Sequence, residues 1–331
     1  MDPRDRQAAS PLPRRRFLTY GAALLFARTL AACSSKTDLT GDDAGTGAAG
    51  DGGTSTAAGD AASAVDVDAS GVAWATGGTA SMTGKANYPN PFASGTPTTC
   101  AMTCELTQGP CYSSQSVEIQ DISYGYDGLP MRIYLQILDE SCKPVSGAVV
   151  DVWHVSPVGK YSGDDSANEQ IAFCTGNDSD FTSHLYFRGK QTTDANGIVY
   201  FDTCFPGWYS SRTVHIHMTI SVGGQAYVTT QLCFDDALDD EIIASQPIYD
   251  TRGKRDTTNS TDSVYSSGSF ADYEFQTAKM TDGAMLAWKT LILRSSLSET
   301  ICGGGGSSSG GATGDGGGPP PGFDGGAAPG M

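Results

Sequence analysis

Apolar and polar residues alternate with a period of two through the middle of this chain. Between Met131 and Ile137 every second residue is apolar, and Arg132, Tyr134 and Gln136 stand between them. Successive side chains of a β-strand point to opposite faces, so this pattern predicts a half-buried strand. An apolar run at residues 148–155, bounded by proline and glycine, predicts a second strand.

Turn signals separate further runs of the same kind. The sequence DANG at residues 194–197 precedes an apolar run, and TDG at residues 281–283 lies between Phe275 and the run 286–293. Aspartate and glycine at these places indicate tight turns and, in the second case, a hairpin. Many short strands without a long capped helical pattern predict an all-β fold, a β-sandwich.

Low-complexity sequence flanks these strands. Residues 34–94 are mostly Gly, Ala, Ser, Thr and Asp, and residues 303–331 are rich in Gly and Pro. Such segments bury too little apolar surface to offset chain entropy. We therefore expect a flexible linker at 34–94, one folded domain at 95–302 and a disordered tail at 303–331.

Residues 1–33 have the features of an export signal. Arg14 and Arg15 precede an apolar segment that is too short to span a bilayer. This pattern resembles a twin-arginine signal, and the sequence LAAC ending at Cys33 resembles a lipobox. We expect export by the twin-arginine route and a lipid anchor at Cys33. The protein would then be a lipoprotein of the periplasm or cell envelope, a location that includes the cell surface. The alternative is a simple cleaved signal without lipidation.

The charge excludes one class of partner. The chain of 331 residues has a formal net charge of -17. A surface this acidic repels phosphate backbones and anionic lipid. We expect no nucleic-acid binding, and membrane contact only through the anchor at Cys33.

The nine cysteines predict disulfides. Cys33 belongs to the signal, and the other eight lie between Cys100 and Cys302 without a C-x-x-C pair. An even number in an exported protein fits up to four disulfides better than a structural zinc site. The sequence leaves their connectivity open.

Two histidines share one face of a predicted strand. From Val214 to Val222 apolar and polar residues alternate, and His215 and His217 stand two positions apart. Residues i and i+2 of a strand point the same way, so the two imidazoles converge as a pair of metal ligands would. Such a pair alone is more often exposed on a half-buried strand, and the interpretation depends on its neighbours.

Two tyrosines and an arginine are those neighbours. Tyr209 and Arg212 lie in the turn before His215, and Tyr161 follows a strand and Gly159. A phenolate is a hard anionic ligand that suits Fe(III), whereas structural zinc prefers thiolate and imidazole. Two phenolates and two imidazoles together predict a mononuclear Fe(III) site.

Four short motifs support this interpretation. They are G-x-Y-S-G around Tyr161, R-G-x-Q-x-T-D from Arg188, P-G-x-Y ending at Tyr209 and R-x-x-H-I-H from Arg212. In this order they resemble the intradiol ring-cleavage dioxygenase family, in its secreted, protocatechuate 3,4-dioxygenase-like branch. The resemblance covers about residues 104–293.

The resemblance implies a reaction and roles. The implied ligands of Fe(III) are Tyr161, Tyr209, His215 and His217. Tyr209 is also the ligand that the substrate displaces, Arg212 stabilises negative charge on the substrate ring, and Gln231 lies at the pocket. The implied substrates are a catechol and O2, and the ring opens between its two oxygenated carbons to a cis,cis-muconate-type product.

Departures from the family pattern leave the substrate open. Gln108 stands where the family more often has glutamate, and Cys111 where an aromatic residue is usual. Both lie near the expected mouth of the pocket. The oligomeric state cannot be inferred from these patterns.

Two other functions fit part of the pattern. One is a copper or zinc protein that uses His215 and His217, with His184 as an optional third ligand. A cupin-like site requires a further histidine after the H-x-H pair, and none follows His217. The other is a non-catalytic, tethered β-sandwich that binds a partner. Such a module would have kept the fold and lost the catalytic residues, and the presence of both tyrosines and Arg212 argues against this. His154, at a strand end, is expected to be structural.

Overall fold

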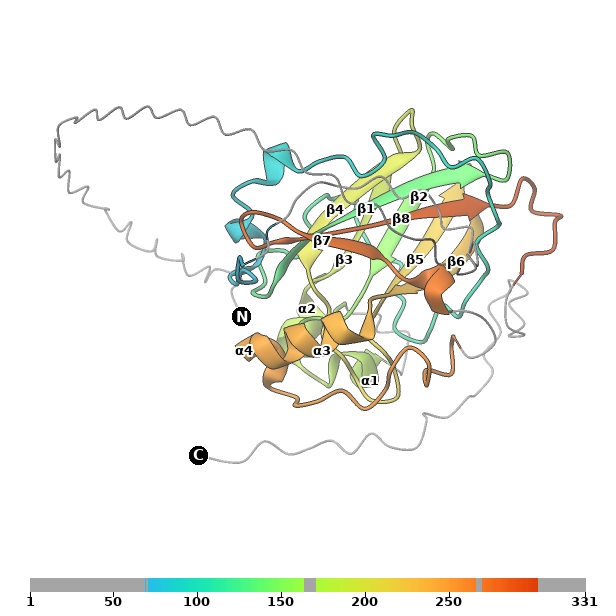
Figure 1. Cartoon of the computed structure of the whole chain (residues 1–331). Helices are drawn as coiled ribbons and strands as arrows, with labels where there is room; N and C mark the ends of the chain where they lie inside the picture. Colours follow the sequence, from blue (N-terminus) through green and yellow to red (C-terminus); the bar gives the residue numbers. More distant parts are fainter. Residues whose placement is uncertain (1–68, 70, 164–170, 266–269, 303–331) are drawn as a thin grey trace, which may run out of the picture. The chain divides into compact units, whose positions relative to one another are not determined.

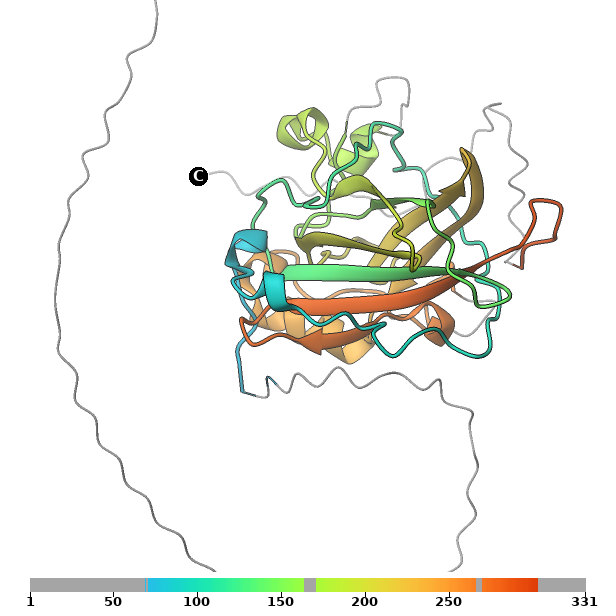
Figure 2. The same cartoon turned by 90° about the horizontal axis from the view of Figure 1, so that it is seen from above.

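The computed structural model describes residue 69 and residues 71–163, 171–265 and 270–302. The predicted signal with Cys33, most of the predicted linker and the predicted tail lie outside these residues. In the described part, eight strands form two four-stranded sheets that pack as a β-sandwich (Figures 1 and 2). The prediction of an all-β sandwich is confirmed. No helix in this part is long and apolar enough to span a membrane.

The first sheet has the strand order β4-β1-β8-β7. Strand β1 (Pro130–Asp139) pairs antiparallel with β4 (Ile198–Cys204) and parallel with β8 (Met285–Leu293). Strand β7 (Gln276–Lys279) pairs antiparallel with β8 and forms with it the predicted hairpin. The parallel pair places the first and the last strand of the chain side by side in the described residues.

The second sheet has the order β3-β2-β5-β6 and is antiparallel throughout. Its strands are β2 (Val149–Trp153), β3 (Arg188–Thr192), β5 (His215–Val222) and β6 (Gln225–Cys233). All strands that the sequence predicts are present in the two sheets.

The core lies between the sheets, on one face of each. Alternate residues of β1, β2 and β5 contribute fully buried apolar side chains to one cluster. These include Met131, Ile133, Leu135, Val150, Val152, Ile216 and Met218. Removal of such side chains from water is the main favourable contribution to folding. Because side chains alternate along a strand, the residues between these core positions point to the opposite face of each sheet.

The outer face of the first sheet is buried as well. Arg132, Tyr134 and Gln136 are 5%, 8% and 3% exposed, so β1 is not the half-buried strand that its alternation predicts. Residues 71–94 cover this face. Met82 and Phe92 from this segment form a second apolar cluster with Tyr134 and Leu286.

Hydrogen bonds tie this covering segment to the sandwich. The Tyr88 hydroxyl donates to the Asp282 carboxylate at 2.8 Å, and Arg132 Nη1 donates to the Lys85 carbonyl at 2.9 Å. The composition predicts a linker up to residue 94, and this is wrong for residues 71–94. The composition of this segment is mostly polar, but its few large side chains are enough to pack it on the sheet. The sheet itself provides the apolar surface that these side chains contact.

The helices gather at one end of the sandwich in Figure 1. Helices α1 (Ile171–Thr175) and α2 (Ser179–Ser183) lie on one side in Figure 2, and α3 (Asp236–Ser245) and α4 (Pro247–Asp250) on the other. The described 3-10 turns are η1 (Gly78–Ser81), η2 (Lys85–Asn87) and η3 (Phe270–Tyr273). The sequence pattern misses α3, although Asp235 caps it by accepting from two backbone amides.

Three disulfides form among the eight described cysteines, which lies within the predicted limit of four. They join Cys100 to Cys142, Cys104 to Cys302 and Cys111 to Cys174. Cys204 and Cys233 remain buried thiols, at the ends of strands that belong to different sheets. Each packs as a small apolar side chain, and burial raises the pKa of both thiols.

We predict that the covering segment contributes to stability. Met82→Ala removes a side chain that is 3% exposed and should lower the free energy of unfolding by about 2 kcal/mol. Urea denaturation followed by circular dichroism measures this change. The control Val72→Ala alters an exposed residue of the same segment and should change it by less than about 0.5 kcal/mol. Equal effects of both substitutions would contradict the prediction.

Candidate metal centre

His215 and His217 lie at the beginning of β5, on the face that points away from the core. Val214, Ile216 and Met218 enter the core and are fully buried. The two histidines are each 2% exposed, so they are covered from the other side as well. The predicted alternation is correct, and the exposed-pair alternative is not.

The strand register places His217 in a row of four side chains. Arg188 on β3, Trp153 on β2, His217 on β5 and Gln231 on β6 are neighbours across the second sheet. The Trp153 ring stacks on the His217 imidazole with a centroid distance of 5.0 Å and an angle of 12°. This contact fixes the plane of the imidazole.

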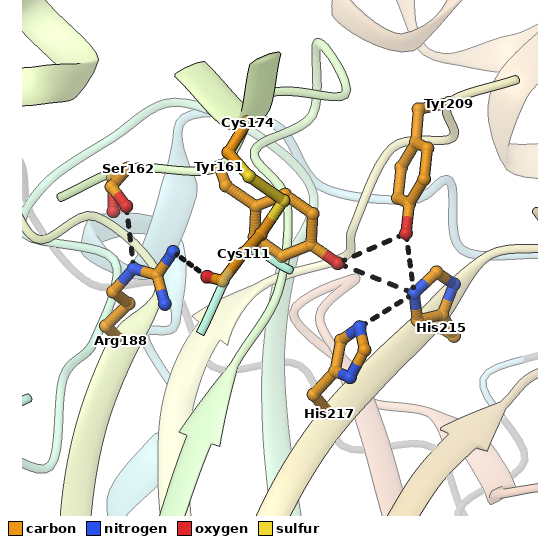
Figure 3. The surroundings of a disulfide bond; sticks show 8 residues. All are labelled: Cys111, Tyr161, Ser162, Cys174, Arg188, Tyr209, His215 and His217. Atoms are coloured by element: carbon orange, nitrogen blue, oxygen red, sulfur yellow. Dashed lines mark hydrogen bonds between the residues drawn. A yellow bond between two sulfur atoms is a disulfide. The ribbon is translucent and has the colours of Figure 1, made fainter. Parts of the chain in front are cut away.

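Tyr161 and Tyr209 reach the same place from loops. Tyr161 follows β2, and Tyr209 lies in the turn that leads into β5. Their hydroxyl oxygens are 3.4 Å apart and lie 3.5 Å and 3.2 Å, respectively, from His215 Nε2 (Figure 3). His215 Nε2 is also 3.1 Å from His217 Nε2. Four donor atoms from three segments therefore converge.

The spacing of these atoms fits a shared metal ion. Donors bound about 2.0–2.2 Å from one ion lie about 2.9–3.5 Å from each other. His215 Nδ1 donates to the Thr213 carbonyl at 2.6 Å, which leaves the lone pair of Nε2 directed at the other donors. A backbone partner on the second nitrogen is the usual way in which a protein orients a ligating histidine.

Burial determines the charge of the donors. It lowers the pKa of His215 and of His217 well below the ordinary value, with the Arg212 charge adding to the effect on His215. Both imidazoles are therefore neutral, the form that binds metal. Burial, together with the Tyr209 phenol, raises the pKa of Tyr161 well above its ordinary value. A multivalent cation is the group that would ionise such a phenol.

The site depends on its phenols. No group of three His, Cys, Asp or Glu side chains in the described residues is arranged to hold a metal ion. His184 is exposed, with Nδ1 2.7 Å from the Asp180 carbonyl and its ring stacked on Tyr186. The described residues thus form no three-histidine copper or zinc site. A donor set of two oxygens and two nitrogens favours a hard ion such as Fe(III).

Arg212 and Gln231 lie beside the donors and bind one another. Arg212 Nη2 donates to Gln231 Oε1 at 2.5 Å, and Gln231 Nε2 donates to the Thr107 carbonyl. Arg212 Nε donates to Asp262 at 2.9 Å. Burial lowers the pKa of Arg212, but the nearby Tyr209 and Asp262 outweigh this and raise it overall. A permanent positive charge is therefore held at the site.

The segment that holds this turn has no distinctive sequence motif. The clamp loop, residues 256–262, binds residues 210–213 through Asp256, Asn259 and Asp262. Fully buried Asp262 accepts from the Thr213 amide at 2.8 Å as well as from Arg212. The only sequence signal is three side-chain acceptors spaced three residues apart, which is common in loops.

His154 has a structural role, as predicted. It is fully buried, and its two ring nitrogens contact the Val155 carbonyl at 2.7 Å and the Thr203 hydroxyl at 2.8 Å. With both nitrogens engaged, it has none left for a metal.

A family model described as Dioxygenase matches residues 107–278. This range contains the four donor residues, Arg212, Gln231 and the clamp loop.

Curated relatives are similar to part of the chain. Catechol 1,2-dioxygenase 1 of Acinetobacter lwoffii is 29% identical over 168 residues, which are 44% of this chain and 49% of the relative. Chlorocatechol 1,2-dioxygenase of Pseudomonas sp. (strain P51) is 30% identical over 124 residues, 32% of this chain and 44% of the relative. The chain thus spans about half the length of the curated relatives it matches.

Among solved structures, an intradiol ring-cleavage dioxygenase from Tetranychus urticae has a similar fold. It is 25% identical with a TM-score of 0.52, and the match covers 59% of this chain and 95% of that structure. The two-sheet architecture is therefore shared across nearly the whole of that protein.

We predict that Asp262 stabilises the turn around Arg212. Asp262→Ala leaves the partly buried Arg212 guanidinium and the buried Thr213 amide without their acceptor, and should lower the free energy of unfolding by about 3 kcal/mol. Chemical denaturation measures the change. Asp240→Asn removes an exposed carboxylate from Arg255 and serves as the matched control, with an expected change below about 1 kcal/mol. A loss at Asp262 no larger than at Asp240 would show that the clamp is unimportant.

Proposed function

This chain belongs to the intradiol ring-cleavage dioxygenase family, and from that premise we propose that it is an Fe(III)-dependent enzyme that cleaves a catechol-type ring with O2. One observation carries the proposal. Two phenol oxygens from loops and two imidazole nitrogens from β5 converge, with four of the distances between them at 3.1–3.5 Å. Tyr161, Tyr209, His215 and His217 are the proposed ligands.

The proposed reaction balances without a further reductant. Catechol and O2 give cis,cis-muconic acid: the bond between the two hydroxylated carbons breaks, and each of these carbons receives one oxygen atom. Bound Fe(III) would make a chelated catecholate reactive toward O2. Once ionised, the Tyr161 and Tyr209 phenolates would offset the charge of a bound Fe(III) and favour its oxidised state, while the neutral histidines would add no charge.

Arg212 has the proposed role of stabilising negative charge on the substrate. Its guanidinium cannot turn away, because Asp262 holds Nε and Gln231 holds Nη2. A fixed cation in a water-poor site stabilises developing charge without reorganisation. Gln231 orients Arg212 and is itself oriented by the Thr107 carbonyl.

The names of the relatives support a first choice of substrate to test. By their names, they act on catechol and chlorocatechol, so we propose an uncarboxylated catechol as the first substrate to test. A tethered binding module without activity is the alternative that the same fold would serve.

We predict that the protein loaded with Fe(III) is coloured and consumes O2. Phenolate ligation should produce a visible charge-transfer band, which catechol should shift to longer wavelength before a muconate absorbance appears. A spectrophotometer and an oxygen electrode measure both events. A colourless protein after iron loading would exclude the proposed ligand set. A coloured protein that takes up no O2 with any catechol would favour the binding module.

We predict that Arg212→Gln lowers kcat by about 10²–10³-fold while the visible band persists, because the four donors are untouched. Steady-state kinetics with catechol measure the loss. Arg212→Lys, which keeps the charge but not the planar fork, should lose less. Lys254→Gln changes an exposed cation and should behave as wild type. Unchanged kcat in Arg212→Gln would remove Arg212 from the mechanism.

A further inference from the structure

Tyr161 differs from the histidine donors because no strand holds it. It lies in the loop after β2 and is nevertheless 3% exposed. A donor on a loop must be positioned by contacts with other segments, and a metal site tolerates little displacement of its ligands.

The backbone of Tyr161 is part of a closed ring of bonds, of which Figure 3 draws the disulfide and the two Arg188 hydrogen bonds. Its amide donates to the Cys174 carbonyl at 2.9 Å, and Cys174 is joined to Cys111 by a disulfide. Arg188 Nη2 donates to the Cys111 carbonyl at 2.6 Å. Arg188 Nε donates to the carbonyl of Ser162 at 2.8 Å, and Ser162 follows Tyr161 directly. Because Ser162 is covalently bonded to Tyr161, this last hydrogen bond closes the ring.

Arg188 joins the Cys111 carbonyl to the Ser162 carbonyl within this ring. It is fully buried, its hydrogen bonds go to backbone carbonyls, and its guanidinium lies 5.7 Å from the centre of the Tyr161 ring. A buried charge without a carboxylate hydrogen-bond partner is costly and calls for a reason. Phe187, just before it, has a φ of 61°, which is strained for a bulky residue. A buried charge and a strained residue therefore stand next to each other at the beginning of β3.

The Cys111–Cys174 disulfide fixes the position of two segments that have little secondary structure of their own. Helix α1, which carries Cys174, has only five residues, and such a helix does not hold its position by itself. Cys111 lies in a loop 63 positions earlier in the sequence. Both cysteines pack with Tyr161 and Trp153 in one small apolar cluster. The cystine therefore ties two weakly structured segments to the metal site.

We propose that Arg188 and the Cys111–Cys174 disulfide form a brace that positions the Tyr161 phenol, so that the affinity for Fe(III) depends on this disulfide. The proposal rests on the proposed function and deepens it, since it names the elements that make the ligand set complete. Reduction of the brace takes two electrons and two protons from a dithiol: the S–S bond breaks, two thiols form, and the dithiol becomes a disulfide.

The double variant Cys111→Ser/Cys174→Ser tests the brace. The iron-loaded protein is titrated with EDTA while the visible band and protein-bound iron are recorded. We expect the variant to lose iron at an EDTA concentration at least about tenfold lower than wild type. The matched control Cys100→Ser/Cys142→Ser removes a disulfide that holds the turn after β1, and should retain iron as wild type does.

A Tyr161→Phe background separates positioning from general loosening of the fold. If the brace acts through the phenol, its removal should cause no further loss of iron once Tyr161 is phenylalanine. Equal losses in both backgrounds would overturn the proposal, as would wild-type iron retention in Cys111→Ser/Cys174→Ser.

Arg188→Lys provides a second test with the disulfide intact, and it decides the question if the double cysteine variant does not fold. Lysine cannot hold both carbonyls with a fork, so iron should again be lost at lower EDTA, by several-fold. Wild-type retention in Arg188→Lys would overturn the brace. If wild type itself binds no Fe(III), the proposed function fails; if wild type binds and the brace variants bind equally, only the brace fails.

Discussion

Removal of the donor atoms from water is the constraint on which the rest of this site depends. Two imidazoles and a phenol are nearly or fully buried, and burial keeps all three neutral without a metal. A neutral, dry cluster of lone pairs is suited to a multivalent cation, whose charge replaces the solvation that the donors have lost. The nearby positive charge of Arg212 is offset by Asp262, and its repulsion of a bound cation is thereby reduced.

Each donor obtains its position by a different route. Strand β5 places His215 and His217 through simple alternation, and the sandwich core anchors that strand from its other face. The clamp loop holds the turn that carries Tyr209 and Arg212. Tyr161 depends on contacts from Arg188 on β3, from α1 and from the Cys111 loop. Rigid placement of a weakly structured loop thus requires long-range contacts, whereas the strand requires only its register.

Local patterns predicted what local physics controls. The strands, the hairpin at Asp282 and the convergence of His215 with His217 follow from a period of two and from turn residues. The failures share one cause. The covering segment at residues 71–94 and helix α3 are both decided by what packs against them, which composition and spacing do not describe.

By itself, therefore, the sequence predicted the fold class, the strands and the four side chains that we propose as donors, because these predictions depend on neighbours a few residues away and on short motifs. Only the tertiary structure decided that the donors meet, that Asp262 holds Arg212 and that Cys111 pairs with Cys174. Those contacts join residues far apart in the chain. Their energy depends on distances of a few ångströms in space, for which linear spacing carries no information.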